Sequence, residues 1–206
     1  MNRIITVSRQ FGSGGRELGK RLAELLGAAY YDREIVRAIS EKSSLAESYV
    51  DQIVEQHIVS YYPITVANSL VSLPHDPLGQ LNCTIYAAQT EVLREMAGKS
   101  DCVIVGRCAD HILREFRPLN IFVYADMPSK MRRCREKHGD EYSALPDREL
   151  QRKIQSIDRA RSRYYGSYTG KNWGDKLNYD ICVNTSTGSI KKIAAGIAAM
   201  LHEEEE

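Results

Sequence analysis

The 206-residue sequence has no C-x-x-C pair, and its five cysteines and five histidines are scattered along the chain. Zinc sites and redox motifs depend on closely spaced ligands or thiols, so neither kind of site is expected. An odd number of scattered cysteines instead indicates reduced thiols, as in a cytoplasmic protein. The cysteines are Cys83, Cys102, Cys108, Cys134 and Cys182.

Long apolar runs and a charge excess are also lacking. No run approaches the roughly 18 apolar residues that a membrane helix needs, and residues 1–7 are too short for the apolar segment of a secretory signal. The net charge is +1, so attraction to a nucleic acid or a membrane would need a local patch. With 43% hydrophobic and 27% charged residues, the composition is that of a globular protein with room for one sizeable core.

A glycine-rich stretch, SRQFGSGGRE over residues 8–17, stands out near the start of the chain. It follows the apolar run 4–7 and precedes a segment of helical periodicity, whose apolar face is expected to hold Leu18, Leu22, Leu25 and Leu26. In a strand, glycine loop and helix, backbone N–H groups turn toward an anion and the helix dipole adds its positive end. We therefore predict a phosphate cradle formed by Gly12, Ser13, Gly14, Gly15, Arg16 and Glu17.

The same stretch departs from the Walker pattern G-x-x-x-x-G-K-[ST]. When Gly14 is placed on the last glycine of the pattern, Arg9 takes the position of the first glycine. Gly15 then stands where the lysine belongs, and Arg16 stands where the Ser/Thr belongs. Arg16 thus keeps a cation one position late. The competing interpretation is a plain glycine turn before a helix, with Glu17 in the first turn favouring the dipole.

Apolar runs alternate with helical periodicity along the rest of the chain. The strands are expected at residues 4–7, 28–32, 102–105, 120–124 and 179–184, and the later helices at 33–60, 80–98, 109–116, 128–165 and 189–201. Residues 166–178 are expected to form a loop, and the terminal glutamates a frayed end. This alternation is typical of a three-layer α/β fold, a five-stranded parallel sheet with helices on both faces.

On such a sheet, ligands bind at the carboxyl ends of the strands, beside a change in strand order. Arg107 follows the predicted strand 102–105, where its planar fork suits a phosphate or a carboxylate, and Asp110 could orient it. A surface carboxylate is the competing partner for Arg107. The residues expected to contact a ligand on this side of the sheet, which the family resemblance described below makes the acceptor side, are Asp32, Arg37, Arg107 and Asp110.

The segment 128–165 is strongly basic. Arg159 and Arg163 are four residues apart and share a helix face, whereas Arg161 points nearly opposite. This cluster of arginines indicates binding of several phosphates. An RNA-binding strip is the competing interpretation, since the nearby tyrosines could stack bases, but no signature of an RNA module accompanies them. Nucleic acid is therefore not the expected partner.

Several segments together resemble the cytidylate kinase-like family, a branch of the P-loop nucleoside monophosphate kinases. They are ITVSRQFGSGGRELGKRLAELLG, YYDREIV, CVIVGRCADHIL, IFVYADMP and DRARSRYYGSYTGKNWGDKLNYDICVNTS, in order over residues 4–186. The aspartate that follows the motif arginine in true cytidylate kinases is Cys108 here. The resemblance therefore leaves the acceptor open.

The resemblance implies one domain with three parts. These are a P-loop kinase-like core (residues 1–37, 99–127 and 178–206), a helical acceptor-binding insertion (about 38–98) and an arginine-rich lid (about 128–170). It implies that Ser13 to Arg16 cradle the donor phosphates, that Arg107 meets an acceptor monophosphate, and that the lid contributes Arg159, Arg161 and Arg163. It also implies ATP and Mg²⁺, for which the candidate ligands are Ser13, Glu17 and Asp126.

We therefore expect ATP-dependent phosphoryl transfer to a nucleoside monophosphate, CMP-like, or to a related small acceptor. Catalysis in this class consists of positioning and charge neutralisation, which we assign to Arg16, Arg159 and Arg163. The rival hypothesis is a non-catalytic nucleotide or phosphate sensor that has lost transfer. The expected partners are small-molecule nucleotides and no membrane, and a homo-oligomer stays open.

Overall fold

The computed structural model describes residues 2–47, 50, 77–137 and 140–203. Its centre is a 5-stranded parallel sheet in the order β2-β3-β1-β4-β5. The expected α/β fold is therefore confirmed. The strands are β1 (Ile4–Arg9), β2 (Ala29–Tyr31), β3 (Cys102–Val105), β4 (Leu119–Tyr124) and β5 (Ile181–Asn184).

The middle strand, β1, is buried along its whole length, and its neighbour β3 is buried likewise. Val7 of β1 pairs in register with Val105 of β3 and with Ile121 of β4. Uninterrupted apolar runs of this kind are what a strand covered on both faces needs. The chain forms β2 and β3 on one side of β1, and β4 and β5 on the other. The carboxyl end of β1 therefore lies at the change in strand order.

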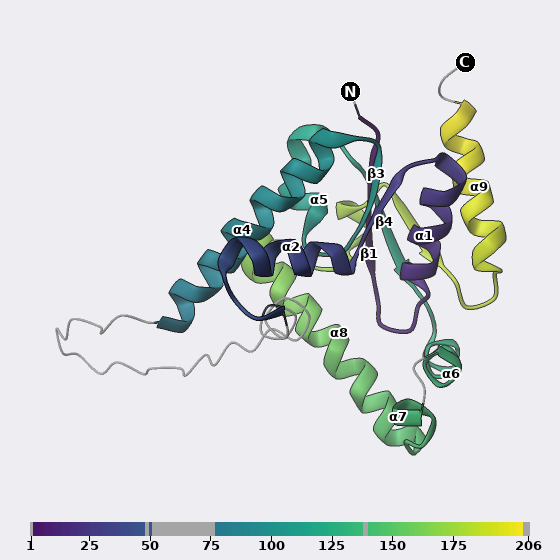
Figure 1. Cartoon of the computed structure of the whole chain (residues 1–206). Helices are drawn as coiled ribbons and strands as arrows, with labels where there is room; N and C mark the ends of the chain where they lie inside the picture. The colour runs from purple at the N-terminus through teal and green to yellow at the C-terminus, as the bar shows by residue number, and fades with distance from the viewer. Residues whose placement is uncertain (1, 48–49, 51–76, 138–139, 204–206) are drawn as a thin grey trace.

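Helices cover both faces of the sheet (Figure 1). The helices are α1 (Gly15–Leu26), α2 (Arg33–Ser43), α4 (Pro77–Lys99), α5 (Ala109–Ile112), α6 (Met127–Lys137), α7 (Asp140–Ser143), α8 (Asp147–Thr169) and α9 (Ile190–Glu203), with 3₁₀ segments η2 (Arg114–Phe116) and η3 (Lys176–Asn178). α1 and α9 pack against Ile5 and Val7, whereas α2, α4, α5 and the end of α8 form the cluster that contains Ile4. Because side chains alternate between the two faces of the sheet along β1, this strand contributes residues to a hydrophobic core on each face.

Two sequence expectations for the N-terminal half differ in detail from the structure. Leu25 is 51% exposed, because the buried stripe of α1 follows the i, i+4 positions Leu18, Leu22 and Leu26. The helix expected over 33–60 ends as α2 at Ser43, since Ser44 takes a left-handed φ of 57°. Of the remainder of that prediction, residues 48–49 and 51–60 lie outside the described residues.

The C-terminal half is divided more finely than the sequence predicts. The helix expected over 109–116 becomes α5 and η2, and the helix expected over 128–165 becomes α6, α7 and α8. α8 continues to Thr169, into the predicted loop, because Tyr164 and Tyr165 are buried in the core, and it ends before the left-handed Gly170. β5 begins two residues late, since the Asp180 carboxylate accepts from the Asn120 N–H at 2.7 Å.

The glycine loop between β1 and α1 is fastened from outside the sheet. The Asp158 carboxylate of α8 accepts from the Phe11 N–H at 2.7 Å, and its other oxygen pairs with Lys130 Nζ of α6 at 2.8 Å. Lys130 is only 5% exposed. α6 and α8 also pack together through Cys134, Leu150 and Ile154. These helices belong to the proposed lid, and the division into core, insertion and lid stays a prediction.

Replacing Asp158 by alanine leaves the buried Lys130 charge without its carboxylate. We expect the free energy of unfolding to fall by about 3–5 kcal/mol, as for other buried ion pairs that lose one partner. Urea denaturation measures this loss. Glu115→Ala is the matched control, because its 3.3 Å pair with Arg94 is exposed and should contribute less than about 1 kcal/mol. Equal losses for the two variants would contradict the assigned importance of Asp158.

Candidate functional site

The glycine loop turns through two left-handed glycines, Gly12 at φ 73° and Gly14 at φ 83°. A Cβ on Gly12 would lie 2.9 Å from the Lys130 carbonyl oxygen, so the close approach of α6 requires glycine there. Gly14 is the N-cap of α1, and the first N–H groups of a helix have no partner within the helix. The loop thus directs N–H groups and a helix dipole to one place, as a phosphate cradle needs.

A cavity of about 210 Å³ opens at this loop. Its lining combines loop backbone with side chains from α1, α6 and α8, and cations predominate over the single carboxylate, that of Glu17. The lining residues are Arg9, Gln10, Phe11, Gly14, Gly15, Arg16, Glu17, Arg133, Lys137 and Arg161. A site with this charge and these exposed amides attracts anions.

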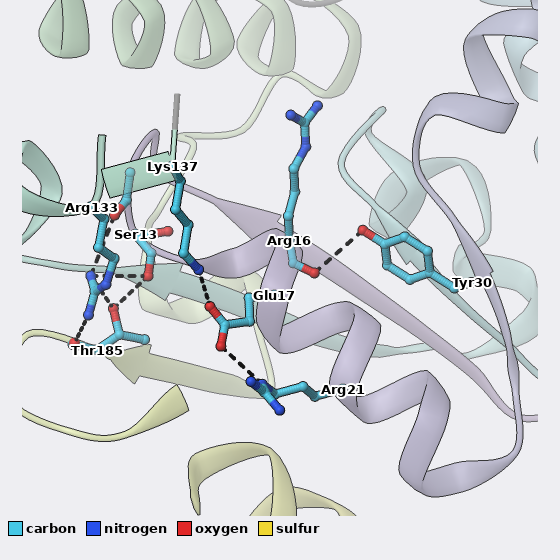
Figure 2. Close-up of polar contacts among 9 residues, drawn as sticks. Ser13, Arg16, Glu17, Arg21, Tyr30, Arg133, Lys137 and Thr185 are labelled. Atoms are coloured by element: carbon cyan, nitrogen blue, oxygen red, sulfur yellow. Dashed lines mark hydrogen bonds and ion pairs between the residues drawn. The ribbon is translucent and has the colours of Figure 1, made fainter. Parts of the chain in front are cut away.

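Arg133 and Thr185 form hydrogen bonds with the backbone of the glycine loop (Figure 2). The Arg133 guanidinium donates to the Gly12 and Ser13 carbonyl oxygens at 3.4 and 3.5 Å, and also to the Thr185 carbonyl oxygen. Thr185 Oγ1 donates to the Ser13 carbonyl oxygen at 2.6 Å. Ser13 itself is fully buried, and its hydroxyl donates to the Gln10 carbonyl oxygen at 2.8 Å. The Ser13 hydroxyl therefore serves the fold of the loop.

Glu17 lies between two cations on the rim of the cavity. Its carboxylate pairs with Lys137 of α6 and, at 3.0 Å, with Arg21 Nε of α1 (Figure 2). Burial alone would raise the pKa of Glu17, but the hydrogen bonds from Lys137 and Arg21 hold that pKa below its usual value. Glu17 is therefore ionised at neutral pH, and Lys137 brings a cation from a distant helix to the phosphate loop.

Asp32 collects two arginines at the end of β2. Arg16 Nε lies 2.8 Å from one carboxylate oxygen, and Arg9 Nη2 lies 4.0 Å from the other. Asp32 and Arg9 are both buried, whereas the Arg16 side chain is 41% exposed. Figure 2 shows Arg16 extending away from Glu17 and Lys137. Asp32, predicted on the acceptor side, thus also contacts residues of the phosphate loop.

Arg107 follows β3 on a segment of unusual backbone. Gly106, Arg107 and Cys108 all take left-handed φ values, 76°, 62° and 51°. Side chains in this region carry strain, which surrounding contacts must maintain. Gln89 Nε2 donates to the Arg107 carbonyl oxygen at 2.9 Å, and the Tyr164 hydroxyl donates to Gln89 Oε1 at 3.1 Å. The α4 and α8 helices thereby fix the turn that presents Arg107.

A second cavity, of about 30 Å³, lies at this turn. Arg107 lines it and is 5% exposed. The other lining residues are Ser8, Arg9, Gly106, Cys108, Arg161, Tyr164, Tyr165 and Trp173. Asp110, one turn along α5, accepts from the Tyr165 hydroxyl at 2.6 Å. Its pKa is raised because burial disfavours the charged carboxylate, although the Tyr165 hydrogen bond opposes this effect.

Only some of the residues that the sequence predicts for the site lie at the two cavities. Arg161 reaches the loop: it donates to the Arg9 carbonyl oxygen at 3.2 Å and lies 5.6 Å from the Phe11 ring centroid. Arg159 and Arg163 are exposed, and neither is among the described residues that line the two cavities. Arg37 is also exposed and pairs with Glu47 at 3.5 Å.

Three cations of the larger cavity were absent from the predicted site, namely Arg9, Arg133 and Lys137. Arg133 and Lys137 are four residues apart, so helical spacing alone places them on one face of a basic helix. Arg9 is the last residue of β1, at the position that the Walker pattern gives to glycine. These two signals could have identified all three residues.

Among the described residues, no cluster of three or more histidine, cysteine, aspartate or glutamate side chains could hold a metal ion. Of the three candidate ligands, Ser13 is engaged within the loop, and exposed Asp126 accepts from the Ser129 N–H at 2.8 Å at the start of α6. Glu17 lines the cavity. Glu17 is therefore the one of the three candidates whose carboxylate lies at the cavity.

The parallel order β2-β3-β1-β4-β5, with a glycine loop between the central strand and α1, matches the P-loop nucleoside monophosphate kinase-like fold. The family model described as "Cytidylate kinase-like family" matches residues 4–187. The chain therefore belongs to the cytidylate kinase-like family. Among curated proteins, none matches the sequence significantly.

Solved structures share the fold at low sequence identity. An uncharacterized protein from Eubacterium ventriosum ATCC 27560 is 23% identical, with a TM-score of 0.67 over 97% of this chain and 98% of that chain. Shikimate kinase from Bacteroides thetaiotaomicron is 14% identical, with a TM-score of 0.59 over 98% and 99%. A sugar kinase from Janibacter sp. HTCC2649 is 11% identical, with a TM-score of 0.55 over 98% and 95%. In the described part of this chain, no helix has the length and apolar character to cross a membrane.

The raised pKa of Asp110 has a consequence for stability. Between the ordinary value of 3.8 and the raised folded value, the folded state binds more protons than the unfolded state, so stability falls as pH rises. Asp110→Asn keeps an acceptor for the Tyr165 hydroxyl and does not titrate. We expect the variant to gain stability relative to the parent protein as pH rises above 3.8. Urea denaturation across this range measures the difference, and a difference independent of pH would contradict the assignment.

Proposed function

We propose that this protein transfers the terminal phosphoryl group of ATP to a nucleoside monophosphate or a related small acceptor. The observation that carries the proposal is the 210 Å³ cavity, in which loop amides and cations converge at the carboxyl end of β1. Membership of the cytidylate kinase-like family supports phosphoryl transfer in general. The volume is below the ~300–1,000 Å³ of pockets that enclose whole small molecules, which favours a site for the phosphate chain.

The donor phosphates are proposed to lie over Gly14 and Gly15, at the N-terminus of α1. Their charge would be neutralised by side chains from three helices, namely Arg16, Lys137 and Arg161. Arg16 and Lys137 together compensate for the glycine that occupies the lysine position of the loop. Arg159 and Arg163, on the same helix as Arg161, are proposed as additional cations for the donor phosphates. They can reach the phosphates only if α8 moves.

The acceptor is proposed to bind beside Arg107. Arginine presents a planar pair of donors that matches two phosphate oxygens, and burial strengthens the interaction. Asp32 and Asp110 flank this side of the crevice and could orient hydroxyl groups of the acceptor. Cys108, in place of an aspartate that helps to read cytosine in true cytidylate kinases, favours an acceptor other than CMP.

The chemistry needs little beyond alignment. An oxygen of the acceptor phosphate attacks the terminal phosphorus in line with the departing diphosphate, and no proton has to move when that oxygen is already ionised. Bound Mg²⁺ would supply further charge neutralisation on the donor phosphates. Glu17 is proposed as the carboxylate that would bind such a metal or its water. The cations of the cavity stabilise charge on the transferred group.

The experiment that tests the function is release of ADP from ATP with a panel of nucleoside monophosphates and nucleosides. Turnover with one acceptor class supports the kinase. ATP binding without turnover on any acceptor supports the rival, a nucleotide sensor, which the glycine at the lysine position favours. Failure to bind ATP would contradict both hypotheses.

Arg16→Ala should weaken ATP binding by roughly 1.5–3 kcal/mol, the contribution of a hydrogen bond to a charged group. Calorimetry measures the change. Lys20→Ala is the matched control on the same helix, because Lys20 is exposed and lies 3.9 Å from Glu24. Unchanged ATP affinity in the Arg16 variant would remove Arg16 from the donor site.

Arg107→Ala should raise the acceptor KM, or lower kcat/KM, while ATP affinity stays within about twofold. The reason is that Arg107 lines the smaller cavity and not, among the described residues, the larger one. The chain has one tryptophan, Trp173, which lines the smaller cavity, so its emission reports acceptor binding directly. Equal losses for both substrates would instead place Arg107 at the donor or give it a structural role.

A further inference from the structure

Arg9 is the last residue of β1, and its side chain crosses the crevice beside two glycines. A Cβ on Gly15 would lie 2.4 Å from Arg9 Cβ, and a Cβ on Gly106 would lie 1.7 Å from Arg9 Nη1. Neither position can carry a side chain while Arg9 keeps this course. Residues from α1 and from the turn after β3 therefore leave room for one buried arginine.

The far end of this side chain is held by a carboxylate. Arg9 Nη2 lies 4.0 Å from Asp32 Oδ1, and Asp32 also pairs with Arg16 at 2.8 Å. The guanidinium of Arg9 thus lies where β1, β2 and β3 end. A guanidinium offers a planar set of N–H donors that matches phosphate oxygens. Asp32 orients this group toward the ends of the three strands.

Arg9 and Arg161 line both the 210 Å³ cavity of the phosphate loop and the 30 Å³ cavity at Arg107. Arg161 Nη1 donates to the Arg9 carbonyl oxygen at 3.2 Å, which joins the two arginines at the boundary. A phosphoryl group that passes from a donor in the larger cavity to an acceptor bound beside Arg107 must cross this boundary. Charge placed there acts on the group in transit.

We propose that Arg9 is a further catalytic residue, which contacts the transferred phosphoryl group between the two cavities. This inference rests on the proposed function. In the step, the bond from the terminal phosphorus to the bridging oxygen breaks, and its electron pair leaves on ADP. The new bond forms between that phosphorus and the acceptor phosphate oxygen. The Arg9 guanidinium donates to the oxygens of the group in transit, where charge is spread over three atoms.

A purely structural role for Arg9, as the partner of Asp32, makes different predictions. A structural ion pair tolerates lysine and has no influence on which nucleotide binds. A residue in contact with the terminal phosphoryl group instead distinguishes a triphosphate from a diphosphate. The preference for a non-hydrolysable triphosphate analogue over ADP is therefore the readout that separates the two roles.

The experiment measures the affinities of the full-length protein for adenylyl imidodiphosphate and for ADP by calorimetry, together with kcat on the acceptor found in the panel. Arg9→Ala should reduce the preference for the triphosphate analogue by about 10- to 100-fold, the range of a charged hydrogen bond, and leave ADP affinity near that of the parent protein. It should lower kcat by about 10²–10³-fold, as loss of a transition-state donor does. Arg152→Ala, an exposed arginine on α8, is the control.

A further variant guards against a folding defect. Arg9→Lys keeps the charge and loses the planar fork, so an intermediate preference and kcat are expected. If Arg9→Lys equals the parent protein in both readouts, or if the parent protein shows no preference for the triphosphate analogue, the inference is overturned. If no acceptor gives turnover but the preference disappears in Arg9→Ala, the kinase function fails while Arg9 remains the ligand of the terminal phosphoryl group.

Discussion

The carboxylate of Asp158 is the contact on which the phosphate loop depends. It accepts from the Phe11 N–H and pairs with the buried Lys130 ammonium, so a loop and two helices meet at one side chain. A short glycine-rich loop has no core of its own, and its shape must be imposed by neighbours. Lys130 and Arg133 impose that shape from α6, Asp158 imposes it from α8, and Thr185 does so from the end of β5.

The same fastening supplies the charge that the loop lacks. α6 brings Arg133 and Lys137 to the loop, and α8 brings Arg161. In the Walker pattern one lysine of the loop itself performs this task. Here these three cations come from segments more than a hundred residues away in sequence and add to Arg9 and Arg16 beside the loop, so part of the charge of the cavity depends on the positions of α6 and α8. The affinity of the cavity for an anion is therefore expected to depend on the positions of α6 and α8.

The layered fold was predictable because β1 begins with a mainly apolar run, because β3 is apolar throughout, and because helices separate the strands. The loop was predictable from its glycines and from the strand before it. The cavity was only partly predictable. Helical periodicity places Arg161 on a different face of the helix from Arg159 and Arg163. The local sequence does not show which of these faces is turned toward the glycine loop. That choice depends on Tyr164 and Tyr165, whose burial fixes the rotation of α8.

The crossing of Arg9 beside Gly15 links two departures from the Walker pattern that look independent in the sequence. A side chain at position 15 would begin 2.4 Å from Arg9 Cβ, so an arginine at position 9 and the Walker lysine at position 15 exclude one another. A P-loop can hold glycine at position 9 with lysine at position 15, or arginine at position 9 with glycine at position 15. Arginine together with lysine would overlap. Glycine at both positions would leave neither of them with a cation. We therefore expect positions 9 and 15 to change together in related sequences, because the two residues jointly determine which position of the loop carries the positive charge.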